Sequence, residues 1–311
     1  MERSSSRLWR PQGEARGSAG SAPLGRTYDL GMARTAGVVL AGGRSSRMGT
    51  PKAALEWHGS TLLRRTVGVI TRVVDGPVVV VRAPGQDLPS LPASTEVVAD
   101  TREGKGPVQG IAAGLAALAG RAEVAFVSST DMPCLHPAFV RRVLAAVRDG
   151  TDVGLPVARG YPQPLAASYR VQLAQLAERL VEQERLRPAF LFDECAVDRM
   201  DEVALRSDPV LAAFDPELES VLNVNEPADY AVARERPAPE VTVQRFGPLA
   251  DGHRGPEPVR AATIAEAAAA AGLALDGHVV AALNGDQITR DGEVPLATGD
   301  VVFFLSADAG G

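Results

Sequence analysis

The 311-residue chain has few cysteines, few histidines and no long apolar run, and each shortage argues against a class of protein. Its two cysteines, Cys134 and Cys195, lie far apart and form no CxxC pair, which argues against a disulfide scaffold and a thiolate metal site. The four histidines show no metal-ligand spacing. No apolar run approaches the roughly 20 residues that cross a bilayer. A net charge of −6 gives no general attraction for nucleic acid or anionic membrane, so we expect neither partner and a cytoplasmic location.

Residues 1–35 differ in composition from the rest of the chain. They are rich in serine, glycine and arginine, and they lack the continuous apolar segment of a secretory signal. We therefore expect a disordered extension over residues 1–35. Met32 stands just before the first predicted strand, and we expect translation of the natural protein to start there.

From residue 36 to residue 234, strand and helix patterns alternate. Short valine-rich runs and related patterns predict strands near residues 38–40, 78–81, 96–98, 124–127, 153–156 and 165–169. Amphipathic or apolar stretches predict helices over residues 62–74, 108–119, 138–148, 172–183 and 228–234. This alternation is typical of an α/β domain with a mostly parallel sheet, whose ligands bind at the carboxyl ends of the strands.

A second, smaller domain is predicted over residues 241–311. Prolines flank Ala238 and make residues 235–240 a stiff linker. Beyond it, strand patterns cover residues 241–246, 279–283 and 301–305, and an alanine-rich helix covers residues 263–271, with Thr263 as its N-cap. Asn284-Gly285 predicts a hairpin turn. One helix among several strands indicates a small α+β domain.

The stretch that follows the first strand, "LAGGRSSRMGTPK", has the features of a phosphate-binding loop. Gly42 and Gly43 permit positive φ and close approach of the backbone, so that their amides can face phosphate oxygens. Arg44, Arg47 and Lys52 supply cations for a polyphosphate. The spacing matches neither GxGxxG nor GxxxxGK[ST], which argues against a dinucleotide-dependent oxidoreductase and a P-loop ATPase.

Two carboxylates are candidates for the same site. Asp131 follows the strand near residues 124–127, where it can hold Mg²⁺ against phosphate oxygens; a plain turn before Pro133 is the alternative. Asp100 follows the strand near residues 96–98 and precedes a glycine-rich helix start that can accept an anion. Glu103 is an equally available carboxylate beside it.

A pair of amides lies near the end of the first domain. Asn223 and Asn225 are two residues apart, so on a strand they share one face and can bind a polar ligand. Asn225 can equally cap the helix that begins at Pro227. Both interpretations stay open.

The stretch "LAGGRSSRMGTPK" closely resembles the signature LAGGxSxRMGxxK of the molybdenum cofactor guanylyltransferases, within the nucleotidyltransferase superfamily. "TDMP", "QPLAA" and "NVNEPAD" resemble further segments of that family. The resemblance implies a Rossmann-like fold and transfer of GMP from GTP to molybdenum-bearing molybdopterin, with Mg²⁺ bound by Asp131. Combined with the charges, it assigns nucleotide binding to Leu40, Ala41, Gly42, Gly43, Arg44, Lys52, Asp100, Asp131, Asn223 and Asn225, and catalysis to Arg47, Lys52 and Asp131.

One position departs from this family. At the end of the second strand the family often has an asparagine that contacts the nucleotide, whereas this chain has Val80-Val81-Arg82. Base selection is therefore open at this position. Transfer of CMP, or a sugar-phosphate acceptor, remains an alternative with the same loop.

The last 71 residues end in Gly310-Gly311 and resemble the ubiquitin-like sulfur carriers, which have a β-grasp fold and include the small subunit of molybdopterin synthase. The resemblance implies that the carboxylate of Gly311 is adenylated and converted to a thiocarboxylate, with an adenylating enzyme and the large synthase subunit as partners. The chain departs from the common "PPVxGG" ending, because it reads "LSADAGG". An accessory domain with an inert tail, and a protein that is chiefly a sulfur carrier, are the alternatives.

Overall fold

The computed structural model describes residues 34–42, 51–100, 102, 104–250, 252 and 255–307. Several predicted positions lie outside these residues, namely Met32, Gly43, Arg44, Arg47, Glu103, Gly310 and Gly311. Among the helices that the structure describes, none has the length and apolar character needed to cross a membrane.

The first of two large sheets has eight strands within the described residues, in the order β10-β7-β9-β6-β1-β4-β5, with β8 paired to β7. Their bounds are β1 Thr35–Leu40, β4 Val78–Arg82, β5 Thr95–Ala99, β6 Val124–Ser129, β7 Val153–Ala158, β8 Tyr161–Pro162, β9 Ala166–Arg170 and β10 Val197–Met200. The strands β4, β5 and β6 run parallel to the central β1, and β10 runs parallel to β7. The predicted α/β class with a mostly parallel sheet is confirmed.

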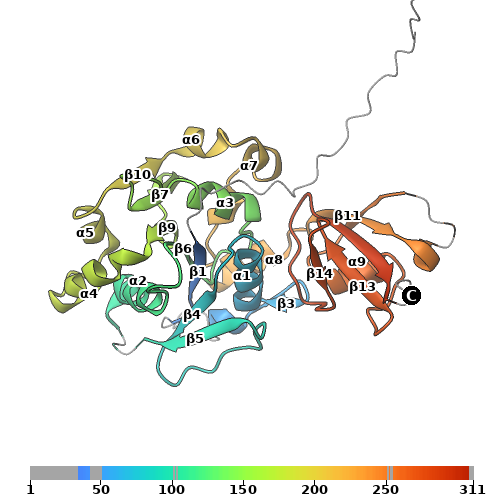
Figure 1. Ribbon diagram of the computed structural model, residues 1–311, viewed down its shortest axis with the longest axis horizontal. Coiled ribbons are helices and arrows are strands. Elements are labelled where there is room, and N and C mark those ends of the chain that lie inside the picture. The colour runs from blue at the N-terminus through green and yellow to red at the C-terminus, as the bar shows by residue number, and fades with distance from the viewer. Residues whose placement is uncertain are drawn as a thin grey trace, which may run out of the picture.

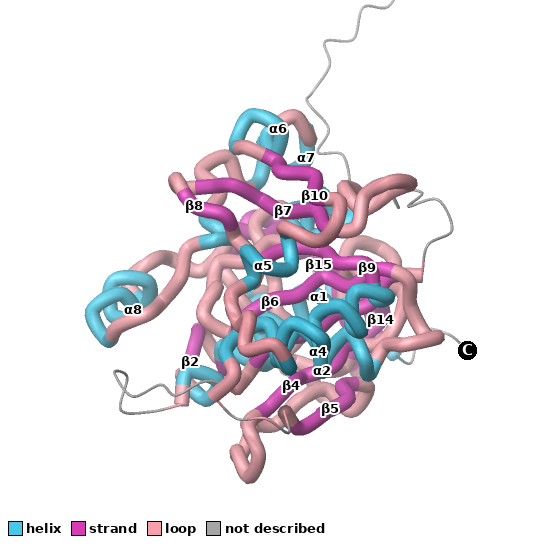
Figure 2. Tube along the Cα trace, turned by 90° about the vertical axis from the view of Figure 1, so that its left-hand side faces the viewer, coloured by secondary structure: helices cyan, strands magenta, loops and turns pink. Residues whose placement is uncertain are grey.

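Helices cover both faces of this sheet (Figures 1 and 2). The helices of this part of the chain are α1 Leu62–Thr71, α2 Gly106–Ala117, α3 Pro137–Leu144, α4 Ala174–Glu182, α5 Pro188–Phe192, α6 Glu202–Arg206, α7 Pro209–Phe214 and α8 Pro227–Arg234. Of these, α8 projects away from the sheet in Figure 2 and packs beside Trp57 and Leu62. Successive residues of a strand point to opposite faces, so Val39 packs with α1 and α3 while Val38 packs with α2 and α4. The sheet is therefore buried on both sides, as the valine-rich strands predict.

The helix α2 approaches β1 very closely, through glycines. A Cβ at Gly114 would lie 2.3 Å from Val38 Cγ1, and one at Gly110 would lie 3.1 Å from Leu40 Cδ2. Because these glycines have no side chain, the N-terminus of α2 comes down beside the end of β1. This contact brings the glycine-rich segment before α2 to the same edge of the sheet as Leu40.

Residues 240–307, here called the C-terminal unit, form a separate five-stranded sheet in the order β12-β11-β15-β13-β14. Its elements are β11 Glu240–Arg245, β12 Glu257–Arg260, α9 Ile264–Ala270, β13 Val279–Leu283, β14 Gln287–Thr289 and β15 Val301–Ser306. α9 packs on one face of this sheet and completes a core of its own. The Thr263 N-cap is confirmed, since its hydroxyl accepts a hydrogen bond from the Glu266 amide at 3.2 Å. Asn284 and Gly285 both have positive φ, as the predicted turn requires.

Short elements connect these parts of the chain. The strands β2 (Glu56–Trp57) and β3 (Ser60–Thr61), each two residues long, form a hairpin before α1. Single 3-10 turns occur at Lys52–Ala54, Val171–Leu173, Glu219–Val221 and Gly247–Ala250.

Several details differ from the sequence-based expectations. Thr35, expected in the extension, is buried in β1. The strand β9 is antiparallel to both of its neighbours, β6 and β7, so the sheet is not parallel throughout. The edge strands β10, β12 and β14 were not predicted, because each is short and mostly exposed on one face.

Candidate active site

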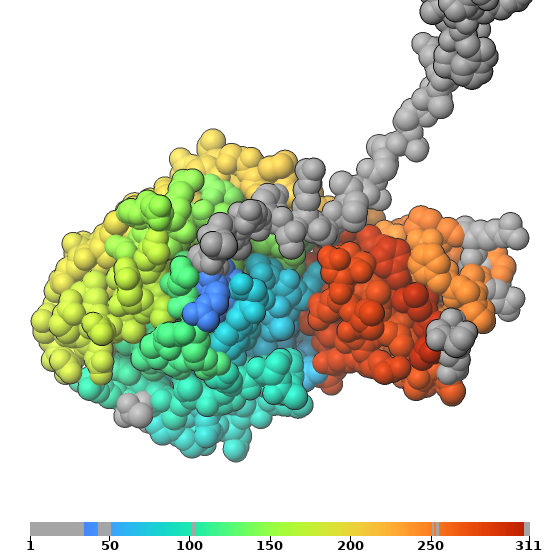
Figure 3. All heavy atoms as spheres, viewed as in Figure 1, coloured from blue at the N-terminus to red at the C-terminus, as the bar shows by residue number. Residues whose placement is uncertain are grey.

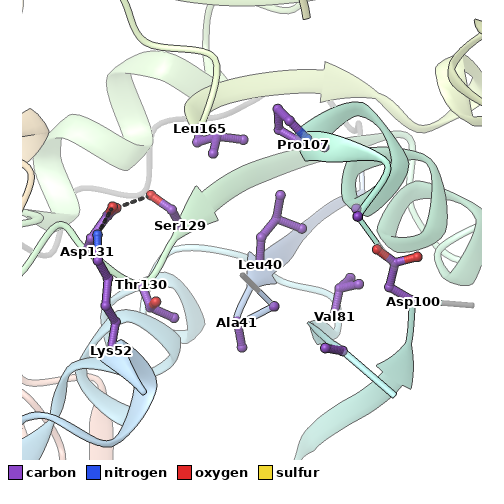
Figure 4. Close-up of a pocket in the computed structure, with 15 residues that line it drawn as sticks. Leu40, Ala41, Lys52, Val81, Asp100, Pro107, Ser129, Thr130, Asp131 and Leu165 are labelled. Carbon is purple, nitrogen blue, oxygen red and sulfur yellow. Dashed lines mark hydrogen bonds and ion pairs between the residues drawn. The ribbon is translucent and has the colours of Figure 1, made fainter. Parts of the chain in front are cut away.

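The main pocket lies at the carboxyl ends of β1 and β6, where the chain direction across the sheet reverses. From β1 the chain passes outward through β4 to β5 and then returns to β6 on the other side of β1. In open α/β sheets this reversal leaves a crevice in which ligands bind. A cavity of about 600 Å³ occupies it (Figure 4). Its walls include six of the predicted site residues, namely Leu40, Ala41, Gly42, Lys52, Asp100 and Asp131.

Lys52 and Asp131 form an ion pair on one side of this pocket. Lys52 opens the 3-10 turn after β1, and Asp131 follows β6, so two neighbouring strands deliver the pair. Lys52 Nζ lies 3.1 Å from Asp131 Oδ2 and 3.1 Å from Asn225 Oδ1. The Lys52 side chain is 20% exposed and that of Asp131 is 18% exposed. The pair is thus open to solvent and can exchange partners when a charged ligand enters.

Ser129 completes this cluster, although it was not among the residues predicted from the sequence. Its hydroxyl donates a hydrogen bond to Asp131 Oδ1, and it lines the pocket. The position was detectable, because Ser129 is the last residue of a buried strand and stands two residues before the predicted metal ligand. The serine occupies one carboxylate oxygen while the lysine occupies the other (Figure 4).

Asp100 lies on the opposite side of the pocket from Asp131 (Figure 4). It follows β5, and its amide donates to the carbonyl of Arg82 at 2.7 Å. Its Oδ1 accepts a hydrogen bond from the Arg102 amide at 3.0 Å, which fixes the carboxylate at the start of the loop toward α2. The two carboxylates therefore face a ligand from two sides of the cavity. Both line the same pocket, but they do not contact each other.

The predicted role of Gly42 is wrong in its conformational detail. Gly42 is not among the glycines with positive φ, and its amide donates to the carbonyl of Val81 at 3.2 Å. This amide is therefore not available to a phosphate. The glycine is needed for another reason, because a Cβ there would lie 3.2 Å from the Ala83 nitrogen. It allows the end of β1 to pass close to the chain after β4.

The predicted pairing of Asn223 and Asn225 is only half present. Residues 222–225 are not in a strand, and Asn223 is exposed and does not line the pocket. The Val224 amide donates to the Asp131 carbonyl at 2.8 Å, which brings Asn225 to Lys52. The alternative role of Asn225 as helix cap is wrong, because Glu226 is the N-cap of α8 and Asp229 accepts from its amide.

The pocket's donor set suits a hard divalent cation. Among the residues described, no group of three or more His, Cys, Asp or Glu side chains forms a preformed metal site. Asp131 and the Ser129 hydroxyl, both in the pocket wall, instead offer oxygen atoms, and the amide oxygen of Asn225 lies beside them as a partner of Lys52. Mg²⁺ is commonly held in this way, by one or two carboxylates together with water and substrate phosphates. The residues present therefore fit Mg²⁺ as a cation that binds with a nucleotide.

A lysine–carboxylate pair beside a crevice at the switch point is the arrangement expected of an α/β nucleotidyltransferase. Residues 37–196 match the model of the MobA-like NTP transferase domain, and the chain belongs to this family of enzymes.

Comparisons with individual proteins agree with this assignment. The chain is 41% identical over 150 residues to a probable molybdenum cofactor guanylyltransferase of Mycobacterium avium, covering 47% of this chain and 74% of the relative. It is 30% identical over 168 residues to a protein of the same description from Bacillus cytotoxicus, covering 53% and 83%. The crystal structure of molybdopterin-guanine dinucleotide biosynthesis protein A from Archaeoglobus fulgidus superposes with a TM-score of 0.52 at 24% identity, covering 64% and 97%. This last likeness supports the fold.

Proposed function

We propose that this enzyme transfers GMP from GTP to molybdenum-bearing molybdopterin and releases pyrophosphate, forming a guanine dinucleotide cofactor. The observation that carries the proposal is the Lys52–Asp131 pair at the mouth of a cavity large enough for a nucleotide. The relatives described as molybdenum cofactor guanylyltransferases supply the base and the acceptor of this proposal.

In this proposal Lys52 leaves Asp131 and binds the triphosphate of GTP. Its ammonium partners include the oxygens of Asp131 and Asn225 at 3.1 Å, which phosphate oxygens can replace without moving the backbone. The released Asp131, with Ser129 on its other oxygen, would hold Mg²⁺. When bound, Mg²⁺ supplies positive charge that neutralises phosphate oxygens. Arg44 and Arg47, outside the described residues, are proposed to add charge for the leaving pyrophosphate.

The transfer itself needs positioning and charge more than proton transfer. An oxygen of the acceptor's terminal phosphate attacks the α-phosphorus of GTP in line. The new P–O bond forms as the bond from the α-phosphorus to the bridging oxygen breaks, and pyrophosphate leaves. A phosphate nucleophile is already ionised at neutral pH, so no general base is required. The pocket's contribution is then orientation and electrostatic stabilisation. Asp100, on the opposite wall, is proposed to bind the nucleotide from that side.

A nucleotide-selectivity assay tests the proposal. Purified enzyme is given molybdopterin that carries molybdenum, with GTP, CTP, ATP or UTP in turn, and the dinucleotide product is measured. We expect product with GTP, and we expect Asp131→Asn to lower the rate at least about a hundredfold, the usual effect of removing an electrostatic contact in a reacting site. Asp198→Asn is the matched control, since Asp198 lies on the edge strand β10 opposite Arg148. A preference for CTP, or activity only with a sugar phosphate, would reject guanylyl transfer.

A second function is proposed for the C-terminal unit, as a sulfur carrier with a β-grasp fold. The observation that favours it is the strand order β12-β11-β15-β13-β14, with β11 and β15 parallel at the centre and α9 across one face. In this proposal residues 36–234 and 241–311 are two domains joined by residues 235–240, and Gly311 carries sulfur after activation by an adenylating enzyme. Deleting Gly310 and Gly311 separates the functions. Guanylyl transfer should remain, whereas formation of a C-terminal thiocarboxylate, measured by mass spectrometry, should be lost.

A further inference from the structure

One face of α1 is the docking surface for the C-terminal unit. Arg65, Gly68 and Arg72 lie at positions i, i+3 and i+7 of this helix and so share a face. The Arg65 guanidinium, which is buried, donates to the carbonyls of Leu296 at 3.2 Å and Ala262 at 3.5 Å. Arg72 donates to the Pro295 carbonyl at 2.9 Å and pairs with Asp300 at 2.5 Å. Each of these partners belongs to the C-terminal unit. Figure 3 shows the two parts in direct contact, red against blue-green.

Gly68 allows the closest approach between the two parts. A Cβ at this position would lie 2.5 Å from Pro295 Cδ and 2.6 Å from Pro295 Cγ, closer than atoms can pack. The proline ring is rigid and cannot swing away. Gly299 makes a similar contact from the other side, because a Cβ there would lie 2.1 Å from the Phe214 ring. The close fit thus requires a glycine on each of the two surfaces, Gly68 on one and Gly299 on the other.

The docked surface continues directly to Lys52 through the β2–β3 hairpin. The Leu62 amide, at the start of α1, donates to the Leu55 carbonyl at 2.9 Å, and the Leu55 amide donates to the Lys52 carbonyl at 3.1 Å. The hairpin between them turns at His58 and Gly59, and a Cβ at Gly59 would lie 3.2 Å from Glu266 Oε1 of the C-terminal unit.

The other side of this hairpin is held by α8. The Tyr230 hydroxyl donates to the Glu56 carbonyl at 2.5 Å, and Arg234 pairs with the Glu56 carboxylate at 2.5 Å. The same segment of chain that carries α8 also places Asn225 on Lys52. The hairpin that follows the 3-10 turn of Lys52 is therefore held between α8 and the C-terminal unit.

We propose that docking of the C-terminal unit on α1 positions Lys52 for nucleotide binding, with Gly68 as the positioning residue that permits it. Lys52 must exchange its side-chain partners when a triphosphate enters, so its aim must come from its backbone. That backbone is hydrogen-bonded to Leu55 and, through Leu55, to the first residue of the docked helix. The inference rests on the proposed role of Lys52 in binding the triphosphate.

Substitution of Gly68 tests the inference without weakening α1. In a helix interior, alanine and leucine have a higher helix propensity than glycine, by up to about 1 kcal/mol. We expect Gly68→Ala to lower kcat/KM for GTP about tenfold and Gly68→Leu to lower it further, mainly through KM, since Lys52 contacts the triphosphate both before and during transfer. Hydrogen exchange should become faster over residues 56–61 and 295–300 in both variants.

Rescue and controls separate positioning from general damage. Pro295→Ala removes the ring atoms that the new Cβ would strike, so Gly68→Ala with Pro295→Ala should recover most of kcat/KM. Thr71→Leu, which adds the same leucine at an exposed position of α1, should behave like the unchanged enzyme. Unchanged kcat/KM in Gly68→Leu, or a loss in Gly68→Ala that Pro295→Ala does not relieve, overturns the inference. Failure of the proposed function looks different, because then Lys52→Ala would itself leave GTP turnover unaffected.

Discussion

Two ion pairs in this molecule each join a basic side chain to an aspartate, but they differ in their exposure to solvent. Lys52 and Asp131 are partly exposed, at 20% and 18% of their side chains, and each has further oxygen or hydroxyl partners within the pocket. Arg72 and Asp300 are 4% and 0% exposed, and lie between α1 and the C-terminal unit. Solvent and an incoming ligand can replace the partners of the first pair, whereas no water competes for the second.

The difference in partners strengthens this contrast. Asp300 accepts from Arg72 at 2.5 Å, from the Asn284 amide group at 3.0 Å and from the Ala297 amide at 2.7 Å. Burial alone would raise the pKa of Asp300, but the charge and hydrogen bonds of Arg72, with those of Asn284 and Ala297, hold the pKa below its ordinary value. One pair therefore suits exchange during turnover, and the other suits permanent attachment.

Removing the exchangeable pair should have the largest effect on activity and almost none on folding. Lys52→Ala deletes the cation proposed to bind the triphosphate, so we expect kcat/KM for GTP to fall about a hundredfold to a thousandfold. The thermal unfolding midpoint should stay unchanged, because the lost pair is partly solvated. Arg121→Ala, which breaks the exposed pair with Glu96, is the matched control and should alter neither quantity. Near-normal turnover by the Lys52 variant would contradict the proposed mechanism.

Breaking the buried pair should give the reverse pattern in stability. Arg72→Met leaves Asp300 buried and without its cation, which we expect to cost about 3–5 kcal/mol in the free energy of unfolding. Denaturant titration followed by far-UV circular dichroism measures this loss. Arg121→Ala again serves as the exposed comparison. A Met variant as stable as the unchanged protein would show that the Arg72–Asp300 pair does not hold the two parts together.

Acid should sharpen the contrast through His136, which lies at the same junction. His136 is the N-cap of α3, where its Nδ1 accepts from the Ala138 amide and its Nε2 donates to the Thr298 carbonyl of the C-terminal unit. Burial lowers its pKa from 6.5 to about 4. Between pH 6.5 and about 4, His136 is therefore protonated in the unfolded chain but neutral in the folded chain. The stability contributed by neutral His136 is complete above pH 6.5 and is lost as the pH falls toward 4.

Unfolding free energies measured between pH 7.5 and 4 check this expectation. His136→Asn keeps a good helix cap and removes the titration, so the decline over this range should become smaller. An equal decline in the Asn variant would assign the effect to other groups. Below pH 4 the free energy of unfolding should fall further as Asp300 is protonated. The pKa of Asp300 is lower in the folded chain than in the unfolded chain, so its carboxylate stabilises the fold above its ordinary pKa, and this contribution is lost as the pH falls through the lowered pKa.

The sequence pointed to one site for Lys52 and Asp131, although not to their ion pair, and it did not point to the Arg72–Asp300 pair at all. Lys52 and Asp131 each follow a strongly apolar strand, and parallel strands bring their carboxyl ends to one edge, so their proximity follows from local patterns. The arginines of α1 carry no such signal. A helical arginine is ordinarily solvated, and only the docked fold shows that Arg65 and Arg72 are buried against backbone carbonyls.

Other errors arose because the decisive contact is distant in sequence. The conformation of Gly42 depends on Val81 and Ala83, and the failure of Asn223 to reach the pocket depends on how Val224 binds the chain at Asp131. Short-range propensity cannot report either contact. A strand near residues 165–169 was predicted, but its antiparallel direction was not, since the direction depends on its pairing with the distant β6 and β7.

The connector over residues 236–239 has no regular secondary structure, and the two parts that it joins are also held together by the buried contacts of Arg65 and Arg72. A protease that cut the chain there would break one peptide bond and leave the arginine contacts of α1 in place. The two fragments should then elute together from a sizing column and separate only in denaturant. Expression of either half alone would therefore expose the surface between α1 and the C-terminal unit, which is buried in the full chain.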